Sequence, residues 1–151
     1  MSDKDFSVTF TVDAPASAVF DSILQVRKWW AGNIEGATDR VGSEFVYRYG
    51  DLHRSMQRIT ELVPGKKVVW HVTDAYLSFA DDKTEWKGTD IVFDIAEKNG
   101  KTTVKFTHIG LTPKCDCYKD CSSGWTAFVG GSLPKFIRSG KVQPDPFAAS
   151  V

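Results

Sequence analysis

The 151-residue chain has no excess of charge of either sign, since 19 basic residues balance 19 acidic ones. A protein without net charge produces no long-range field that would draw it to nucleic acid or anionic lipid. The sequence also contains no run of eighteen apolar residues, and its beginning, Met1 to Asp5, forms no apolar signal segment. We therefore expect a cytoplasmic protein whose partner is neither a nucleic acid nor a membrane.

Cysteine is scarce, and its three copies, Cys115, Cys117 and Cys121, lie close together. An odd number at such short spacing does not suit the disulfide framework of a secreted domain. Residues four apart on a helix hold their Cβ atoms about 5–6 Å apart, whereas a disulfide needs about 3.5–4.5 Å. We expect reduced thiols that pack in the core. A reactive thiolate at a helix N-terminus and a zinc site completed by His108 are the alternatives, although the C-x-C-x3-C spacing lacks paired zinc knuckles.

Several motifs of catalysis and cofactor binding are absent. The chain has no glycine-rich phosphate loop, no Ser-His-Asp order and no H-E-x-x-H motif, so we expect neither a cofactor nor a metal. It also has no internal repeat, low-complexity tract or linker. The length suits one domain, for which we expect residues 1–140, followed by a tail over 141–151.

The first half of the chain begins with a strand pattern. Apolar residues alternate with polar ones over 6–12, which is typical of a strand with one buried face. Pro15 then favours the first turn of a short helix, and 26–30 suggests a second short helical piece. Alternating segments up to about Leu111 predict a run of antiparallel strands, with hairpin turns at Gly50-Asp51 and Asn99-Gly100.

The apolar spacing becomes helical from about Tyr118 to Arg138. Pro134 lies inside that pattern and predicts a kink or an early end near Gly131-Ser132. The order of elements is typical of an α+β helix-grip fold. In this fold a curved antiparallel sheet wraps around a long C-terminal helix, and two short helices follow the first strand.

Aromatic residues make up 13% of the chain and include five tryptophans, more than a core of this size needs. Core packing explains any single ring, but together the rings favour a lined cavity. Those predicted to face inward or to lie at element ends are Trp30, Tyr47, Trp70, Trp86, Phe93, Trp125 and Phe128.

The position of His108 in its strand predicts that it faces the interior together with Val104 and Phe106. It is then either a satisfied core histidine or a polar anchor for a ligand. A general base is less favoured, because the nearby acids Asp90 and Asp94 fall in the outward phase of their strand. His53 and His71 are expected to be more exposed.

Seven pieces of the chain occur in an order that resembles the START/SRPBCC superfamily. The pieces are Phe10 to Pro15, Trp29-Trp30, Ile59 to Pro64, Val69-Trp70, Glu85 to Thr89, Thr107 to Leu111 and Cys117 to Trp125. They are most similar to the branch related to the C-terminal domain of the activator of heat-shock protein 90 ATPase. The resemblance implies a START-like domain with a cavity between sheet and long helix for a small apolar or amphipathic ligand.

Three functions from different classes follow. The leading one is a binding module that holds a small hydrophobic ligand with His108 and the seven rings named above. The second, implied by the resemblance, is a stress-response protein that docks on the chaperone heat-shock protein 90 and stimulates its ATPase. The third is a cyclase- or hydrolase-type enzyme that uses His108. We favour a protein that is not an enzyme.

Overall fold

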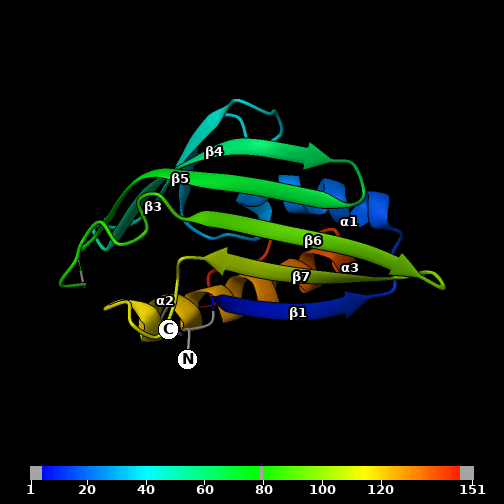
Figure 1. Ribbon diagram of the computed structural model, residues 1–151. Coiled ribbons are helices and arrows are strands. Elements are labelled where there is room, and N and C mark those ends of the chain that lie inside the picture. Colours follow the sequence, from blue (N-terminus) through cyan, green and yellow to red (C-terminus); the bar gives the residue numbers. More distant parts are fainter. Residues whose placement is uncertain (1–4, 79, 147–151) are drawn as a thin grey trace.

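The computed structural model describes residues 5–78 and 80–146. Residues 1–4, 79 and 147–151 lie outside the described part, and with them the end of the predicted tail. Seven antiparallel strands form one curved sheet in the order β1-β7-β6-β5-β4-β3-β2 (Figure 1). The strands are β1 (Phe6–Val12), β2 (Asn33–Glu35), β3 (Glu44–Tyr49), β4 (His53–Val63), β5 (Lys67–Leu77), β6 (Asp90–Lys98) and β7 (Lys101–Ile109).

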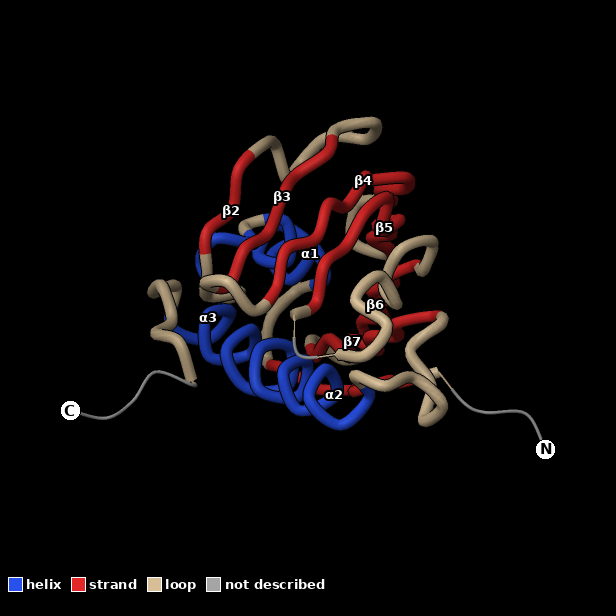
Figure 2. Tube along the Cα trace, turned by 90° about the vertical axis from the view of Figure 1, so that its left-hand side faces the viewer, coloured by secondary structure: helices blue, strands red, loops and turns tan. Residues whose placement is uncertain are grey.

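Helices cover one side of this sheet (Figure 2). They are α1 (Ala16–Leu24), the 3-10 turn η1 (Val26–Lys28), α2 (Tyr118–Ala127), the π-helical turn η2 (Phe128–Ser132) and α3 (Leu133–Ser139). The α+β helix-grip fold predicted from the sequence is therefore confirmed. In the described part of the chain, no helix is both long and apolar enough to cross a membrane.

The strand pairing follows the turn chemistry of the sequence. β6 and β7 pair in register from Asp90↔Ile109 to Lys98↔Lys101. Their two-residue connection has Asn99 at φ 54° and Gly100 at φ 78°, the positive angles that a tight hairpin requires. β1 pairs with β7 rather than with its neighbour in sequence, so the first strand and the last lie side by side at one edge of the sheet.

The predicted C-terminal helix is interrupted where the sequence indicates. After α2 the chain makes one π-helical turn and resumes as α3, with Pro134 in the first turn of α3. Proline has no N–H to donate to the preceding turn, and the wider π-helical turn lies directly before it. A Cβ atom on Gly130 would lie 3.4 Å from the Val8 side chain, so this glycine lets the helical segment approach β1 closely.

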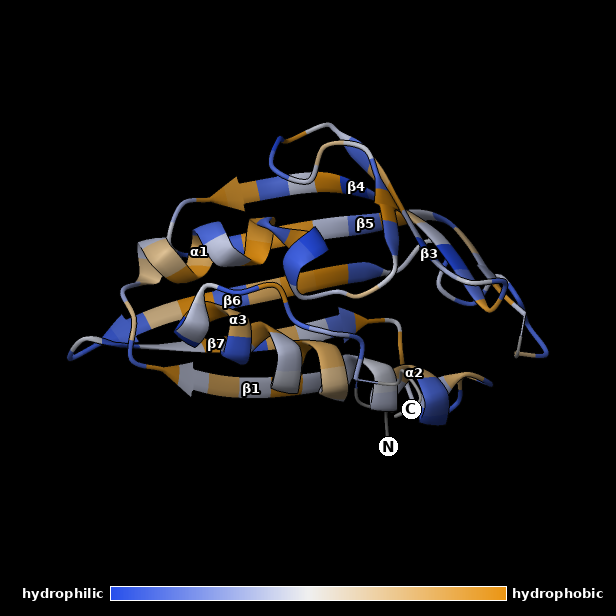
Figure 3. Ribbon diagram, turned by 180° about the vertical axis from the view of Figure 1, so that it is seen from behind, coloured by the Kyte–Doolittle hydropathy of each residue, from blue (hydrophilic) through white to orange (hydrophobic). Residues whose placement is uncertain are grey.

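Large rings fill the interior between sheet and helices. Hydrophobic residues lie on both layers (Figure 3). Trp29, Trp70 and Phe93 are fully buried, and Trp70 meets Phe93 edge to face at 5.1 Å between ring centroids. Burial of such rings contributes about 1.5–3 kcal/mol each. Trp70 and Phe93 therefore belong to the packed core, not to the wall of a cavity as the sequence suggested.

The described part of the tail, residues 141–146, folds back onto the domain. The Gln143 backbone N–H donates to the Lys28 carbonyl at 2.9 Å. Further along, the Tyr49 hydroxyl donates to the Asp145 carboxylate at 2.5 Å. The tail thus connects the end of α3 to η1 and then to β3.

Candidate functional site

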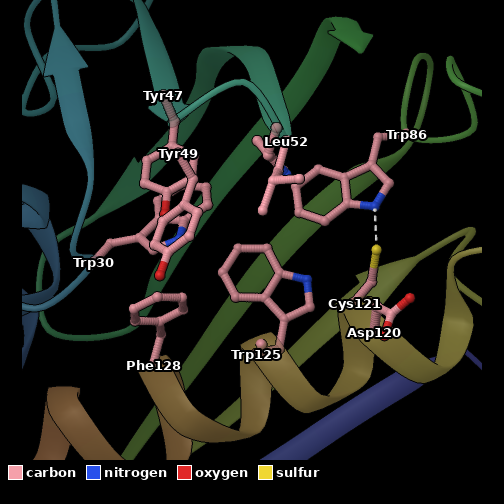
Figure 4. Close-up of a pocket in the computed structure, with 11 residues that line it drawn as sticks. Trp30, Tyr47, Tyr49, Leu52, Trp86, Asp120, Cys121, Trp125 and Phe128 are labelled. Atoms are coloured by element: carbon pink, nitrogen blue, oxygen red, sulfur yellow. Dashed lines mark hydrogen bonds between the residues drawn. The ribbon is translucent and has the colours of Figure 1, made fainter. Parts of the chain in front are cut away.

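A pocket of about 500 Å³ opens between the β3–β4 hairpin and α2 (Figure 4). Its volume falls in the range of about 300–1,000 Å³ that is typical of small-molecule sites. Most of its wall is apolar. The lining residues are Trp30, Tyr47, Tyr49, Leu52, His53, Trp86, Asp120, Cys121, Gly124, Trp125 and Phe128.

The floor of the pocket is a continuous layer of rings in contact, some stacked and some tilted. Trp30 stacks on Tyr47 with centroids 3.8 Å apart, and Trp125 lies 4.9 Å from Trp30 and 5.5 Å from Trp86. The Tyr47 hydroxyl donates to the Ala31 carbonyl at 2.6 Å, and burial raises the pKa of this hydroxyl. Because the rings brace one another, the floor is rigid before any ligand arrives.

Two contacts connect the loop between β5 and β6 to α2. The Trp86 indole N–H donates to Cys121 Sγ at 3.3 Å, drawn as a dashed line in Figure 4. The neighbouring Glu85 carboxylate accepts the backbone N–H groups of Asp116 and Cys117 at 2.7 and 2.9 Å. Those donors precede the helix, where N–H groups have no intrahelical partner and a negative charge is favoured. Glu85 therefore positions Trp86 against the helix.

His108 lies behind this floor, fully buried as predicted. The Trp125 indole N–H donates to His108 Nδ1 at 3.0 Å. Because an indole can only donate, Nδ1 must be unprotonated, and the proton of the neutral ring is on Nε2. His108 Nε2 then donates to Thr89 Oγ1 at 2.8 Å, and the Thr89 hydroxyl donates to the Trp86 carbonyl at 2.6 Å.

This chain of bonds decides what His108 can do. Both ring nitrogens are occupied inside the protein, and burial, with a smaller effect of His53, lowers the pKa of His108 to about 3. The ring is absent from the pocket wall. His108 therefore orients Trp125 and Trp86 from behind, and it has no free nitrogen with which to anchor a ligand or transfer a proton.

His53 faces the pocket, contrary to the prediction from its position in the strand. It was expected to be exposed, but its ring lies edge-on to Trp86 at 4.6 Å and to Tyr47 at 5.1 Å. Its Nε2 is 2.8 Å from the Ser55 hydroxyl, which also accepts the Gln57 amide. Burial lowers the pKa of His53 to about 3, so the pocket wall presents a neutral imidazole at neutral pH.

The pocket brings together five of the eight predicted ligand-binding residues: Trp30, Tyr47, Trp86, Trp125 and Phe128. The other three, Trp70, Phe93 and His108, lie in the core. Six further residues line the pocket that the sequence patterns did not indicate: Tyr49, Leu52, His53, Asp120, Cys121 and Gly124. Tyr49 follows Tyr47 at the strand period and could have been found, whereas Leu52 and His53 depend on how the hairpin curls.

The cysteines form no disulfide: Cys115, Cys117 and Cys121 are free, and the last two are buried. A hydrogen bond with Cys121, burial and the nearby Glu85 carboxylate all raise the pKa of the Cys117 thiol. This is the opposite of the activated thiolate considered above. Within residues 5–78 and 80–146, no group of three or more potential metal ligands gathers, so His108 and the cysteines do not converge on a zinc site.

A family model supports the resemblance seen in the sequence. The model of the activator of Hsp90 ATPase homolog 1-like protein matches residues 13–137. The chain belongs to this family. No curated protein sequence matches it.

Solved structures share the fold. The Aha1 dimer of Colwellia psychrerythraea has a TM-score of 0.72 at 24% identity, and the match covers 91% of this chain and 98% of that one. DynU16, a putative protein in the dynemicin biosynthetic locus, has a TM-score of 0.68 at 16% identity, with 93% of this chain matching 49% of that one. CalU16 of Micromonospora echinospora gives 0.65 at 16% identity, with coverages of 93% and 76%. At these identities the likeness shows the fold.

Proposed function

We propose that this protein binds a small, mainly apolar molecule in the ring-lined pocket between the β3–β4 hairpin and α2. The observation that carries the proposal is a pocket of about 500 Å³ above a braced aromatic floor. Apolar walls with a few polar groups are the usual composition of small-molecule sites. A rigid floor also lowers the entropic cost of binding, since the rings need not be ordered by the ligand.

The polar side chains of the pocket wall indicate which charge the ligand carries. His53 presents a neutral ring, and Asp120 is exposed in the first turn of α2. None of the described residues that line the pocket is a lysine or an arginine. An anionic group inside this pocket would have no cationic side chain to pair with, and the Asp120 carboxylate would repel it. The ligand that fits is therefore neutral, and apolar over most of its surface.

The test uses N-phenyl-1-naphthylamine, a neutral fluorescent probe. It should bind saturably and quench tryptophan emission, because Trp30, Trp86 and Trp125 all line the pocket. Gly124 also lines it, and no atom lies within 4 Å of a Cβ added there. A Gly124→Leu side chain would enter that space, so this variant should weaken probe binding about tenfold or more, the effect of about 1.4 kcal/mol.

Gly131→Leu is the matched control. Gly131 lies in the same helical segment, with no atom within 4 Å of an added Cβ, but it does not line the pocket. This variant should bind the probe as the original protein does. Equal binding by the Gly124→Leu variant, or binding that never saturates, would place the probe elsewhere and refute the proposal.

Chaperone docking is a second candidate, and the family match is the observation that favours it. It is tested by adding the purified protein to heat-shock protein 90 and measuring ATP hydrolysis. If docking uses a surface separate from the pocket, the Gly124→Leu variant should stimulate hydrolysis as fully as the original protein. No stimulation at saturating protein would exclude this candidate and leave the pocket proposal unaffected.

A further inference from the structure

A second hollow lies on the opposite, outer side of the β3–β4 hairpin. It measures about 370 Å³, and its lining residues are Arg48, Gly50, Asp51, His53, Arg54, Tyr76 and Ser78. Unlike the aromatic pocket, its wall carries two guanidinium groups. His53 is the one lining residue that the two pockets share.

The strand register brings the donors of this hollow into one row. Arg48 on β3 is paired directly with Arg54 on β4, and Arg54 is paired with Tyr76 on β5. All three point to the outer face, because the residues next to them in their strands are buried: Tyr47 before Arg48, Ser55 after Arg54, and Ala75 and Leu77 on either side of Tyr76. Tyr76 is 43% exposed. Its hydroxyl can therefore reach a ligand in the hollow.

Two arginines directly opposite each other on neighbouring strands repel, which destabilises a sheet unless an anion lies between them. Little in the protein offsets this repulsion. Arg54 has one carboxylate partner, Asp74, at 3.7 Å. The Arg48 side chain makes no ion pair or hydrogen bond with any residue in the ranges 5–78 and 80–146.

The next arginine along the same face has its partner within the protein, since Arg58 pairs with Glu44 at 3.6 Å. The charge of the Arg48–Arg54 row is thus a local feature and not a general property of the outer face. A concave site with adjacent guanidinium groups is the arrangement that binds phosphate and carboxylate through paired N–H donors.

We propose that the hollow between the β3–β4 hairpin and Tyr76 is a second ligand site that binds an oxyanion, a phosphate or a carboxylate, between Arg48 and Arg54. The Tyr76 hydroxyl supplies a neutral donor. Asp51 lines the same hollow from the hairpin turn and forms no ion pair in the described part of the chain. Its charge opposes an anion, so Asp51 limits the affinity. This site lies across the hairpin from the aromatic pocket and shares only His53 with it.

The experiment is an amide NMR titration with inorganic phosphate, with the ionic strength held constant by sodium chloride. Saturable shifts are expected at residues 48–54 and 76–78. Arg48→Ala should weaken phosphate binding about tenfold or more, as expected for the loss of a charge-assisted hydrogen bond. Asp51→Asn should strengthen it, because a repelling charge is removed without a change of shape.

Arg58→Ala is the matched control, since Arg58 lies on the same face but already has Glu44 as its partner. It should bind phosphate like the original protein. Titrations with phenyl phosphate and benzoate separate the two oxyanions: saturation by one of them identifies the group, and saturation by both identifies a general oxyanion site. Linear shifts with all three anions, or an Arg48→Ala variant that binds as tightly as the original, would overturn the proposal.

Discussion

At the scale of single residues, hydrogen bonds decide the role of a buried histidine. His108 accepts from Trp125 and donates to Thr89, so the two rings and the hydroxyl hold one another in fixed orientations. A histidine without such partners could bind ligand or exchange protons. The network excludes both roles for His108 and turns it into a support for the pocket floor.

His108→Ala should therefore reduce stability more than a change in a surface histidine. The substitution leaves the Trp125 indole N–H without its acceptor and opens a cavity, at a combined cost of about 3 kcal/mol. His71→Ala is the control, because it removes a half-exposed hydrogen bond with Asp90 worth at most about 1 kcal/mol. Urea unfolding of both variants measures the difference. Equal losses would contradict the supporting role of His108.

At the scale of elements, the tail controls the environment of one pocket residue. Tyr49 lines the pocket, and its hydroxyl donates to Asp145 of the tail. This hydrogen bond, together with a smaller effect of burial, raises the pKa of Tyr49 to about 12. The pKa of Tyr49 thus indicates whether Asp145 of the tail contacts the Tyr49 hydroxyl.

Asp145→Ala should lower the pKa of Tyr49 toward about 10, its ordinary value. Without the carboxylate, neither the hydrogen bond nor the negative charge opposes ionisation of the phenol. The absorbance of tyrosinate, followed from pH 8 to 13, measures the change, and a Tyr49→Phe variant identifies which transition belongs to this residue. A Tyr49 transition unchanged by Asp145→Ala would show that the tail does not hold the ring in solution.

Part of the secondary structure could be predicted from the sequence. Alternation predicted β1, the hairpin at Asn99-Gly100 and the helix broken near Pro134, because local turn chemistry and periodicity determine them. The inner face of β4 was not recognised. It carries His53, Ser55 and Gln57 in place of apolar residues. Hydrogen bonds among the three offset part of the cost of burying them, whereas Gln57 Oε1 has no partner in the described part of the chain.

The pocket was predictable only in part, for the same reason. The alternation of residues along a strand shows which rings face inward. It does not distinguish a ring packed in the core from a ring that borders a cavity. Trp70 and Trp125 are both almost completely buried, yet only Trp125 lines the pocket. Curvature of the sheet and the approach of α2 make this distinction, and neither is encoded in a local pattern.

At the scale of the whole molecule, the two inward-facing histidines connect folding to pH. Burial lowers the pKa of both His53 and His108 to about 3, whereas an unfolded histidine has a pKa of about 6.5. Well above pH 6.5 both histidines are neutral in the native and in the unfolded state, so their titration does not change the free energy of unfolding. Below that pH the unfolded chain binds protons that the native protein cannot, so the free energy of unfolding falls until the pH reaches about 3.

The expected loss can be calculated for a fully buried histidine. Between pH 6.5 and pH 5 it is about 2 kcal/mol, and His53 should contribute less than His108 because solvent reaches it at the pocket wall. Urea unfolding at pH 7 and pH 5 measures the sum. The His108→Gln variant, which removes the titrating group but keeps a hydrogen-bonding side chain, should lose less stability between these two pH values. If the original protein and His108→Gln lose the same amount, His108 is already able to take up a proton in the native state, and the closed network behind the pocket floor does not persist in solution.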